Sequence, residues 1–252
     1  VFNIDSNVNS SSDNLENVWK YYKSKYSKAK NNLFNFHGDI RNYNLLENIF
    51  IKARNIDREI IATIHFAGLK SIPDSIFKPV EYWDNNLSGT INLLKTMDKY
   101  GCKVIIFSSS ATIYDPFDHS VIKESTKISP INPYGNTKVA IEKLLRDVYH
   151  SYPNKWKIIN LRYFNPVGSY PKAQIGEKPK EGSTNLFPVL LKVAKGQQNQ
   201  LSIYGNDWPT KDGTCIRDYI HVMDLVEGHI RALDLLLSEN SQFLNINLGT
   251  GI

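Results

Sequence analysis

The stretch that decides the fold is VIIFSSS, residues Val104–Ser110. Its opening run of apolar side chains is typical of a strand that is buried on both faces, as in a parallel sheet covered by helices. The strand leads directly into three serines. Because open parallel α/β sheets bind ligands at the carboxyl ends of their strands, we expect these hydroxyl groups to lie at the active edge of a sheet.

Segments on both sides of this strand alternate between strand-like and helix-like patterns. The strand-like runs are Val1–Ile4, Leu33–Phe36, Ile60–Phe66, Lys157–Tyr163 and Phe243–Leu248, with short strands near Leu201 and Tyr219. The helical patterns run from Asp13 to about Lys30, Asn44 to Asn55, Pro79 to Gly101, Asn132 to Tyr149, Leu186 to Lys195 and Asp224 to Leu237. This alternation predicts an α/β fold with a doubly wound parallel sheet. We expect Ile60–Phe66 to be buried on both faces, like the central strand.

Three helix ends carry local signals. Asp13, followed three residues later by Glu16, predicts a capping box. Asn132 and Pro133 suit the N-cap and the first turn of a helix. Gly101 stands where a left-handed C-cap residue belongs, so the preceding helix is expected to end there.

The composition is that of an ordinary globular protein. Of the 252 residues, 41% are hydrophobic and 22% are charged, which suits one large domain and part of a second. No apolar run approaches the ~20 residues that cross a bilayer, so no membrane partner is expected. The two cysteines, Cys102 and Cys215, are too few for a disulfide framework, and no apolar leader opens the sequence. The expected location is therefore cytoplasmic.

The net charge of +5 raises the question of a nucleic-acid partner. Much of the basic excess lies on five lysines, which read as a solvated helix face: Lys20, Lys23, Lys25, Lys28 and Lys30. No interleaving of aromatic residues with arginine accompanies them, so no nucleic-acid partner is expected. No metal site is expected either.

Tyr134 and Lys138 lie four residues apart in the first turns of a predicted helix, so their side chains share one face. A free tyrosine has a pKa of about 10, which is too high for a base at neutral pH. At ~4 Å and an effective dielectric of ~20, attraction to the lysine is worth about 4 kcal/mol, or roughly 3 pKa units. We therefore expect Lys138 to lower the pKa of Tyr134 far enough for proton transfer near pH 7.

The same Tyr-x-x-x-Lys spacing occurs at Tyr21 with Lys25 and at Tyr26 with Lys30. We interpret those two pairs as coincidences on a surface helix. Only Tyr134 follows a buried strand that ends in serines and sits near a capped helix start, so Tyr134 is the candidate for function.

Several segments together resemble the extended short-chain dehydrogenase/reductase family and, within it, the UDP-galactose (UDP-glucose) 4-epimerases. These segments are Ser108–Tyr114, Pro133–Lys138, His65–Lys70, Asp84–Asn86 with Gly89–Thr90, Arg162–Gly168, Gly205–Thr214 and Arg217–Val222. The resemblance implies a Rossmann-like, NAD-binding fold with a smaller substrate-binding region, and runs over nearly the whole chain. It implies domains at 1–168 and 169–252, with residues 224–248 returning to the first.

The resemblance also implies roles for particular residues. The catalytic residues would be Ser110, Tyr134 and Lys138. The contacts to NAD would be Asp5, Asp39, Ile40, Phe66, Ala67, Gly68, Lys70, Asn85, Tyr134, Lys138 and Tyr163. The contacts to a UDP-sugar would be Lys70, Ser110, Tyr134, Asn165, Asn185, Leu186 and Arg217. Asp5 favours NAD over NADP because a 2′-phosphate would meet its carboxylate, and Arg217 suits a diphosphate through paired, charge-assisted hydrogen bonds.

The chain departs from the family pattern in three ways. It starts after the glycine-rich turn that receives the cofactor diphosphate and stops before a further substrate-domain segment, so both ends look truncated. Asp115–Pro116 stands where the family usually has a glycine. We expect a homodimer when the protein is complete, and weaker NAD binding by the chain as given.

The implied reaction is NAD-dependent interconversion of UDP-glucose and UDP-galactose through a transient 4-keto sugar. Dehydration is not expected, because Ala111 and Thr112, not carboxylates, follow Ser110. Two alternatives stay open: a related 4-epimerase acting on N-acetylated or uronic sugars, and a fragment without catalytic activity.

Overall fold

The computed structural model describes residues 1–26, 32–116, 121–152, 154–171, 175–176 and 185–251. Its strands are β1 (Phe2–Asp5), β2 (Phe34–His37), β3 (Thr63–His65), β4 (Val104–Ser110), β5 (Lys157–Tyr163), β6 (Asn165–Val167), β7 (Tyr219–His221) and β8 (Phe243–Leu248). Its α-helices are α1 (Asp13–Lys25), α2 (Tyr43–Asn55), α3 (Ile72–Phe77), α4 (Pro79–Trp83), α5 (Gly89–Tyr100), α6 (Pro133–Ser151), α7 (Leu186–Ala194) and α8 (Val222–Ser238). The predicted α/β class is confirmed.

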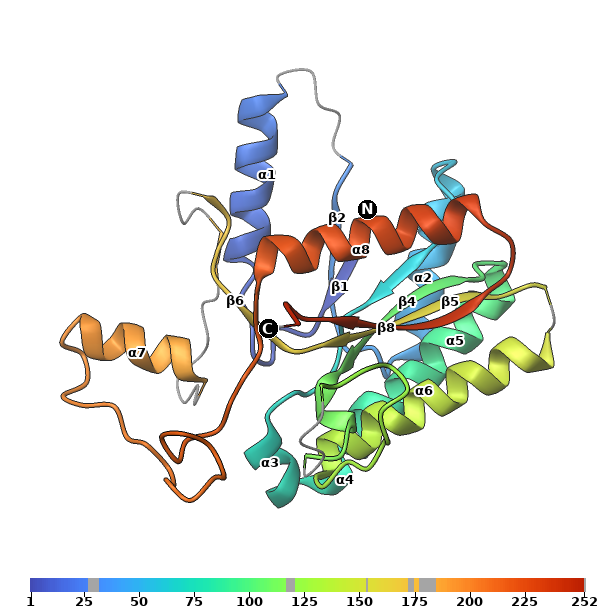
Figure 1. Cartoon of the computed structure of the whole chain (residues 1–252). Coiled ribbons are helices and arrows are strands. Elements are labelled where there is room, and N and C mark those ends of the chain that lie inside the picture. The colour runs from blue at the N-terminus through green and yellow to red at the C-terminus, as the bar shows by residue number, and fades with distance from the viewer. Residues whose placement is uncertain (27–31, 117–120, 153, 172–174, 177–184, 252) are drawn as a thin grey trace.

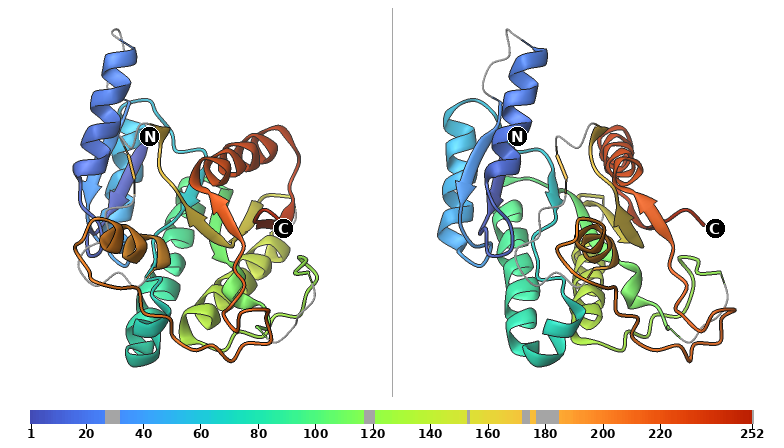
Figure 2. Two further views of the ribbon diagram at one scale, coloured as in Figure 1. Left: turned by 60° about the vertical axis from the view of Figure 1, so that its left-hand side comes forward. Right: turned by 90° about the vertical axis from the view of Figure 1, so that its left-hand side faces the viewer.

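The central sheet has the strand order β3-β4-β5-β8, and all of its strands are parallel. Helix α8 lies on one side of this sheet, and α5 and α6 lie on the other (Figure 1). The pair β1–β2 forms a separate parallel sheet, as does β6–β7. Both views in Figure 2 show β1 and β2, with α1 and α2, on the opposite side of the molecule from α8. In register, Ser110 at the end of β4 lies beside Tyr163 of β5.

Side chains of β4 alternate between the two faces of the sheet. Ile105 and Phe107 pack into the larger core cluster with α2, α5 and α6, whereas Val104 and Ile106 pack against α8. The most exposed of these side chains, that of Val104, is only 9% exposed. The prediction that this strand is buried on both faces is confirmed, and it anchors the serines that follow.

The strand expected at Ile60–Phe66 is shorter and less buried than predicted. Only Thr63–His65 forms β3, and Ile61, Ile64 and Phe66 are 62%, 39% and 58% exposed. The predicted burial on both faces is therefore wrong. β3 is the edge strand of the central sheet, so one of its edges has no strand partner among the described residues, and nearby side chains are less covered.

Most of the predicted helices form with small changes at their ends. The run from Pro79 is continuous but includes a π-helical segment, Asp84–Ser88, and ends at Gly101 with φ of 80°, as predicted. The N-cap of α1 is Ser12, so the capping box expected at Asp13 is wrong. Helix α1 ends at Lys25, and the rest of the stretch predicted up to Lys30 lies largely outside the described residues. No strand forms near Leu201, where residues 201–207 are irregular.

Candidate active site

Ser110 ends β4 at the carboxyl edge of the central sheet and is 8% exposed. Its Oγ accepts hydrogen bonds from the backbone N–H and the hydroxyl of Thr112, at 3.2 and 2.9 Å. These bonds close the short 3₁₀ turn Ala111–Ile113 that follows the strand. The strand end is thereby held in one conformation with the serine at its tip.

Helix α6 begins close to this strand end. Asn132 caps the helix, because its side-chain oxygen accepts from the N–H of Gly135 at 2.8 Å, as the sequence predicts. A Cβ on Gly135 would lie 2.8 Å from the Cβ of Pro130 and 2.9 Å from the carbonyl oxygen of Thr112. Only glycine permits so close an approach, which places the first turn of α6, and with it Tyr134, against the turn after Ser110.

Tyr134 and Lys138 project from α6 into the interior, where they are 9% and 5% exposed. The side chain of Ser110 lies close enough to Tyr134 to act on its pKa. The Nζ of Lys138 donates to the carbonyl oxygen of Ser108 at 2.7 Å and lies 5.7 Å from the centre of the Tyr134 ring. The structure therefore brings together the three residues that the sequence analysis singled out for catalysis.

The electrostatics of this group differ from the expectation. Burial raises the pKa of Tyr134 to about 12, and the neighbouring Ser110 only partly opposes this change. Burial lowers the pKa of Lys138 to about 8, with Glu142 acting in the opposite direction. The expected lowering of the tyrosine pKa by Lys138 is therefore not seen: desolvation dominates, and Lys138 is not among the groups that act on the tyrosine.

A cavity of about 770 Å³ extends between β1 and β3. Its lining includes seven of the residues predicted to contact NAD: Asp5, Asp39, Ile40, Phe66, Ala67, Gly68 and Asn85. Most of the other side chains in the lining are apolar and come from β1, β3, the residues beside these strands and the helices packed on them. Lys70, Tyr134, Lys138 and Tyr163, the other predicted contacts, are not part of this lining.

Two carboxylates of the cavity are held by local bonds. The Oδ1 of Asp5 accepts from the N–H of Asn7 and from the hydroxyl of Ser10, at 2.7 and 3.1 Å, which fixes the turn after β1. Asp39 forms an ion pair with Arg41 at 2.7 Å, and hydrogen bonding to that guanidinium holds the pKa of Asp39 below its usual value. An acidic group at the end of β1 suits a ribose hydroxyl, so the residues present fit NAD.

The segment after β3 is clamped by a residue that the sequence analysis did not assign a role. The side chain of Asn86 accepts from the N–H of Leu69 at 2.8 Å and donates to its carbonyl at 3.1 Å and to Thr137 of α6 at 3.0 Å. A Cβ on Gly68 would lie 3.1 Å from the Oδ1 of Asn86. The π-helical segment thus turns Asn85 toward the cavity and Asn86 toward the loop, and π segments are frequent at functional sites.

Tyr163, at the end of β5, connects the cavity side with the catalytic group. Its hydroxyl is hydrogen-bonded to His229 of α8, and burial raises its pKa, an effect that the nearby Ser108 side chain opposes. The ring of Phe66 lies 5.0 Å from that of His229. Tyr163 is therefore packed beside Ser108 and Tyr134, where a cofactor contact was predicted.

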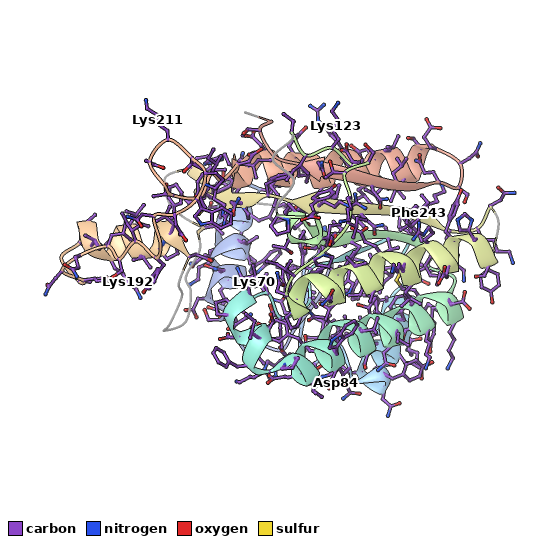
Figure 3. The ribbon with its side chains drawn as sticks, turned by 60° about the horizontal axis from the view of Figure 1, so that its bottom comes forward. Lys70, Asp84, Lys123, Lys192, Lys211 and Phe243 are labelled. Atoms are coloured by element: carbon purple, nitrogen blue, oxygen red, sulfur yellow. The ribbon has the colours of Figure 1, made fainter. Side chains whose placement is uncertain are left out.

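The remaining predicted substrate contacts gather around β6 and β7. The Nδ2 of Asn165 donates to the carbonyl of Asp218 at 2.9 Å, which places it next to the exposed Arg217. Asn185 precedes α7 and Leu186 begins it, and the ring of Phe187 lies 5.3 Å from that of Tyr219. Lys70 belongs instead to the loop after β3, and in Figure 3 it lies toward the other end of the strands from Phe243, the first residue of β8.

Besides Asn86, sequence reasoning missed the buried residues behind the catalytic group, His65, Glu142 and Arg162. Glu142 could have been found, because it lies one helical turn beyond Lys138 on the same face. The partners of His65 and Arg162 are distant in the sequence, so no local pattern indicates them.

No helix among the described residues is long and apolar enough to cross a membrane. The same residues contain no group of three or more His, Cys, Asp or Glu side chains arranged to hold a metal ion.

Comparisons with known proteins agree with this geometry. A bifunctional UDP-glucose 4-epimerase and UDP-xylose 4-epimerase from Pisum sativum is 45% identical over 249 residues, which are 98% of this chain and 69% of the relative. The UDP-glucose 4-epimerase of Bacillus subtilis is 50% identical over 196 residues, which are 77% of this chain and 58% of the relative.

A crystal structure of the Bifidobacterium longum UDP-glucose 4-epimerase in complex with NAD⁺ and UDP superimposes with a TM-score of 0.88 and 42% identity, covering 100% of this chain and 71% of that one. The predicted Rossmann-like class is thereby confirmed. The profile of the NAD-dependent epimerase/dehydratase family matches residues 8–249, and the chain belongs to that family.

Proposed function

We propose that this chain provides the cofactor cavity and the catalytic residues of an NAD-dependent enzyme that interconverts UDP-glucose and UDP-galactose through a transient 4-keto sugar. The observation that carries the proposal is the burial of Ser110, Tyr134 and Lys138 together at the carboxyl edge of the sheet. The relatives described above, which are named as UDP-glucose 4-epimerases, support it.

The proton of the sugar 4-hydroxyl would pass to Tyr134, with Ser110 relaying or holding it. With a pKa of about 12, the phenol requires a nearby positive charge before it can act as a base. Lys138 provides one such charge below its own pKa of about 8. NAD, when bound, supplies the hydride acceptor and donor, and a further positive charge while oxidised.

The substrate handle would be held apart from the reacting carbon. Asn165, Asn185, Leu186 and Arg217 lie around β6, β7 and the start of α7, whereas Ser110 and Tyr134 belong to β4 and α6. Such a separation suits a site that grips the UDP firmly and leaves the sugar free to present either face. We assign the UDP to the first group of residues and the sugar hydroxyl to the second.

The proposal extends to assembly and location. Exposed apolar side chains on α3 and α4, such as Phe77 and Val80 at 83% and 80%, support a homodimer. Cys102 and Cys215 are both free, which supports a cytoplasmic location. The division into domains at 1–168 and 169–252 stays a prediction, with β8 of the second part paired to β5 of the first.

The test is conversion of UDP-galactose to UDP-glucose by the chain supplied with NAD, detected by coupling to UDP-glucose dehydrogenase. Tyr134→Phe should lower the rate by at least ~100-fold, as expected for loss of a general acid–base group. Tyr149→Phe, on the same helix but outside the catalytic group, is the matched control. Turnover by Tyr134→Phe at the level of the control would refute the assignment.

A further inference from the structure

A buried ion pair lies behind the three candidate catalytic residues. Arg162 on β5 and Glu142 on α6 are 2% and 6% exposed. The Nε and NH2 groups of Arg162 donate to the two carboxylate oxygens of Glu142 at 3.0 and 2.7 Å. This paired geometry is the strongest form of a side-chain hydrogen bond between charged groups, and it leaves little freedom to either partner.

Both residues of this ion pair, and the serine bonded to it, lie close to candidate site residues along the chain. The hydroxyl of Ser109, which directly precedes Ser110, donates to Glu142 at 2.6 Å. Glu142 itself lies one helical turn after Lys138, on the same face of α6. Arg162 directly precedes Tyr163. A movement of the ion pair would therefore displace the ends of β4 and β5 and the start of α6 relative to one another.

The outer side of Arg162 is equally constrained. Its NH1 group donates to the hydroxyl of Tyr114 at 2.9 Å and to the carbonyl of Glu124 at 3.0 Å. The hydroxyl of Tyr114 in turn donates to Asn247 of β8 at 2.6 Å. Buried ion pairs of this kind are often no better for stability than apolar residues, so stability alone does not explain this one.

We propose that Glu142, held in place by Arg162, is a positioning residue of the site, and that its negative charge keeps the buried side chain of Lys138 protonated and directed at the end of β4. The proposal deepens the proposed function, but its central measurement does not depend on turnover.

The groups around Lys138 support this role. Burial lowers the pKa of Lys138 to about 8, and Glu142 is the charge that opposes the change. His65 of β3 faces the same ammonium, but burial lowers its pKa to about 3, so it is neutral near pH 7. Burial raises the pKa values of Tyr134 and Tyr163, so both phenols are neutral as well. Glu142, although paired with Arg162, is thus the anion among these groups that favours the protonated lysine.

The experiment is titration of Lys138 in the full chain labelled with ¹³C at the lysine Cε, followed by NMR, with the resonance assigned by its absence in Lys138→Met. Glu142→Gln keeps the shape of the side chain and removes its charge, so the Lys138 pKa should fall by about one unit or more. Glu142→Asp keeps the charge and should restore most of the wild-type value. Glu227→Gln, at the exposed pair with Arg231, is the control and should leave it unchanged.

Turnover gives a second, separate measurement. In Glu142→Gln the alkaline limb of the kcat profile should move to lower pH, with KM for the UDP-sugar changed by less than about threefold. If wild type itself does not turn over, the proposed function fails while the NMR titration still decides the role of Glu142.

The proposal is overturned if Glu142→Gln leaves the Lys138 pKa unchanged, or if Glu142→Asp shifts it as far as Glu142→Gln does. Should Glu142→Gln not fold because Arg162 is left unpaired, the double variant Glu142→Gln with Arg162→Met leaves no uncompensated buried charge. Its Lys138 pKa should also lie below that of wild type, and an unchanged value there overturns the proposal equally.

Discussion

Replacing Lys138 by methionine would measure the electrostatic cost of the candidate site. Lys138 is 5% exposed, and burial lowers its pKa from 10.5 to about 8. One pKa unit corresponds to about 1.36 kcal/mol, so the protonated side chain costs the folded chain about 3 kcal/mol near pH 7. Methionine has a similar length and no charge, so Lys138→Met removes this cost with little change in packing.

The sign of the pH dependence follows from proton binding. The folded chain holds the Lys138 proton less tightly than the unfolded chain, so the unfolded chain binds more protons between pH 8 and 10.5. The wild-type free energy of unfolding should therefore gain about 3 kcal/mol from this residue as the pH rises through that window. Lys138→Met lacks the contribution, so the difference between wild type and variant should change by that amount.

Urea unfolding of the chain without added cofactor, at several pH values from about 7 to 10.5, measures this difference. Lys143→Met, at an exposed position of the same helix, is the matched control and should differ from wild type by a constant amount. A constant difference for Lys138→Met as well would show that the lysine is not a buried cation, and the account of the site electrostatics would be wrong.

Three further predictions concern the surroundings of the site. Gly135→Ala should lower turnover by at least ~10-fold with the fold retained. The new Cβ would lie 2.9 Å from the carbonyl oxygen of Thr112 and would displace Tyr134. Wild-type rates in this variant would contradict the prediction. Burial lowers the pKa of His65 to about 3, so folding opposes protonation of this residue, and the free energy of unfolding of wild type should fall by about 2 kcal/mol between pH 6.5 and 5. His65→Leu should not show this fall. An equal acid sensitivity in both proteins would refute the prediction. Asn86→Ala should cost about 1–3 kcal/mol of stability, because the backbone N–H and carbonyl of Leu69 both lose their partner. NAD binding, measured by calorimetry, should weaken as well. An unchanged NAD affinity would argue against the clamp.

The sequence alone determined the features that depend on neighbouring residues. The apolar run before Ser108 defines β4, and its burial on both faces follows from the absence of any polar side chain in that run. The cap at Asn132 and the left-handed Gly101 are equally local, since each is decided by one side chain and the backbone beside it. The pairing of Tyr134 with Lys138 follows from helical periodicity.

Predictions failed where a distant contact outweighed the local pattern. Ile60–Phe66 reads as a buried strand, but its burial depends on which strands lie beside it, and β3 is at an edge. Leu201 has an apolar pattern without a neighbouring strand to pair with among the described residues, so the backbone there is irregular. Burial and pairing of strands are properties of the assembled sheet rather than of any one segment.

Tertiary structure alone decided the chemistry of the site. The lysine spacing predicts a lowered tyrosine pKa, yet folding removes water from both groups and raises the pKa of Tyr134 to about 12. The contacts of Lys138 with Ser108, of Glu142 with Arg162 and of Asn86 with Leu69 join residues that are far apart in the chain. Desolvation and long-range hydrogen bonds exist only once the elements have packed, so no pattern in the sequence can report them.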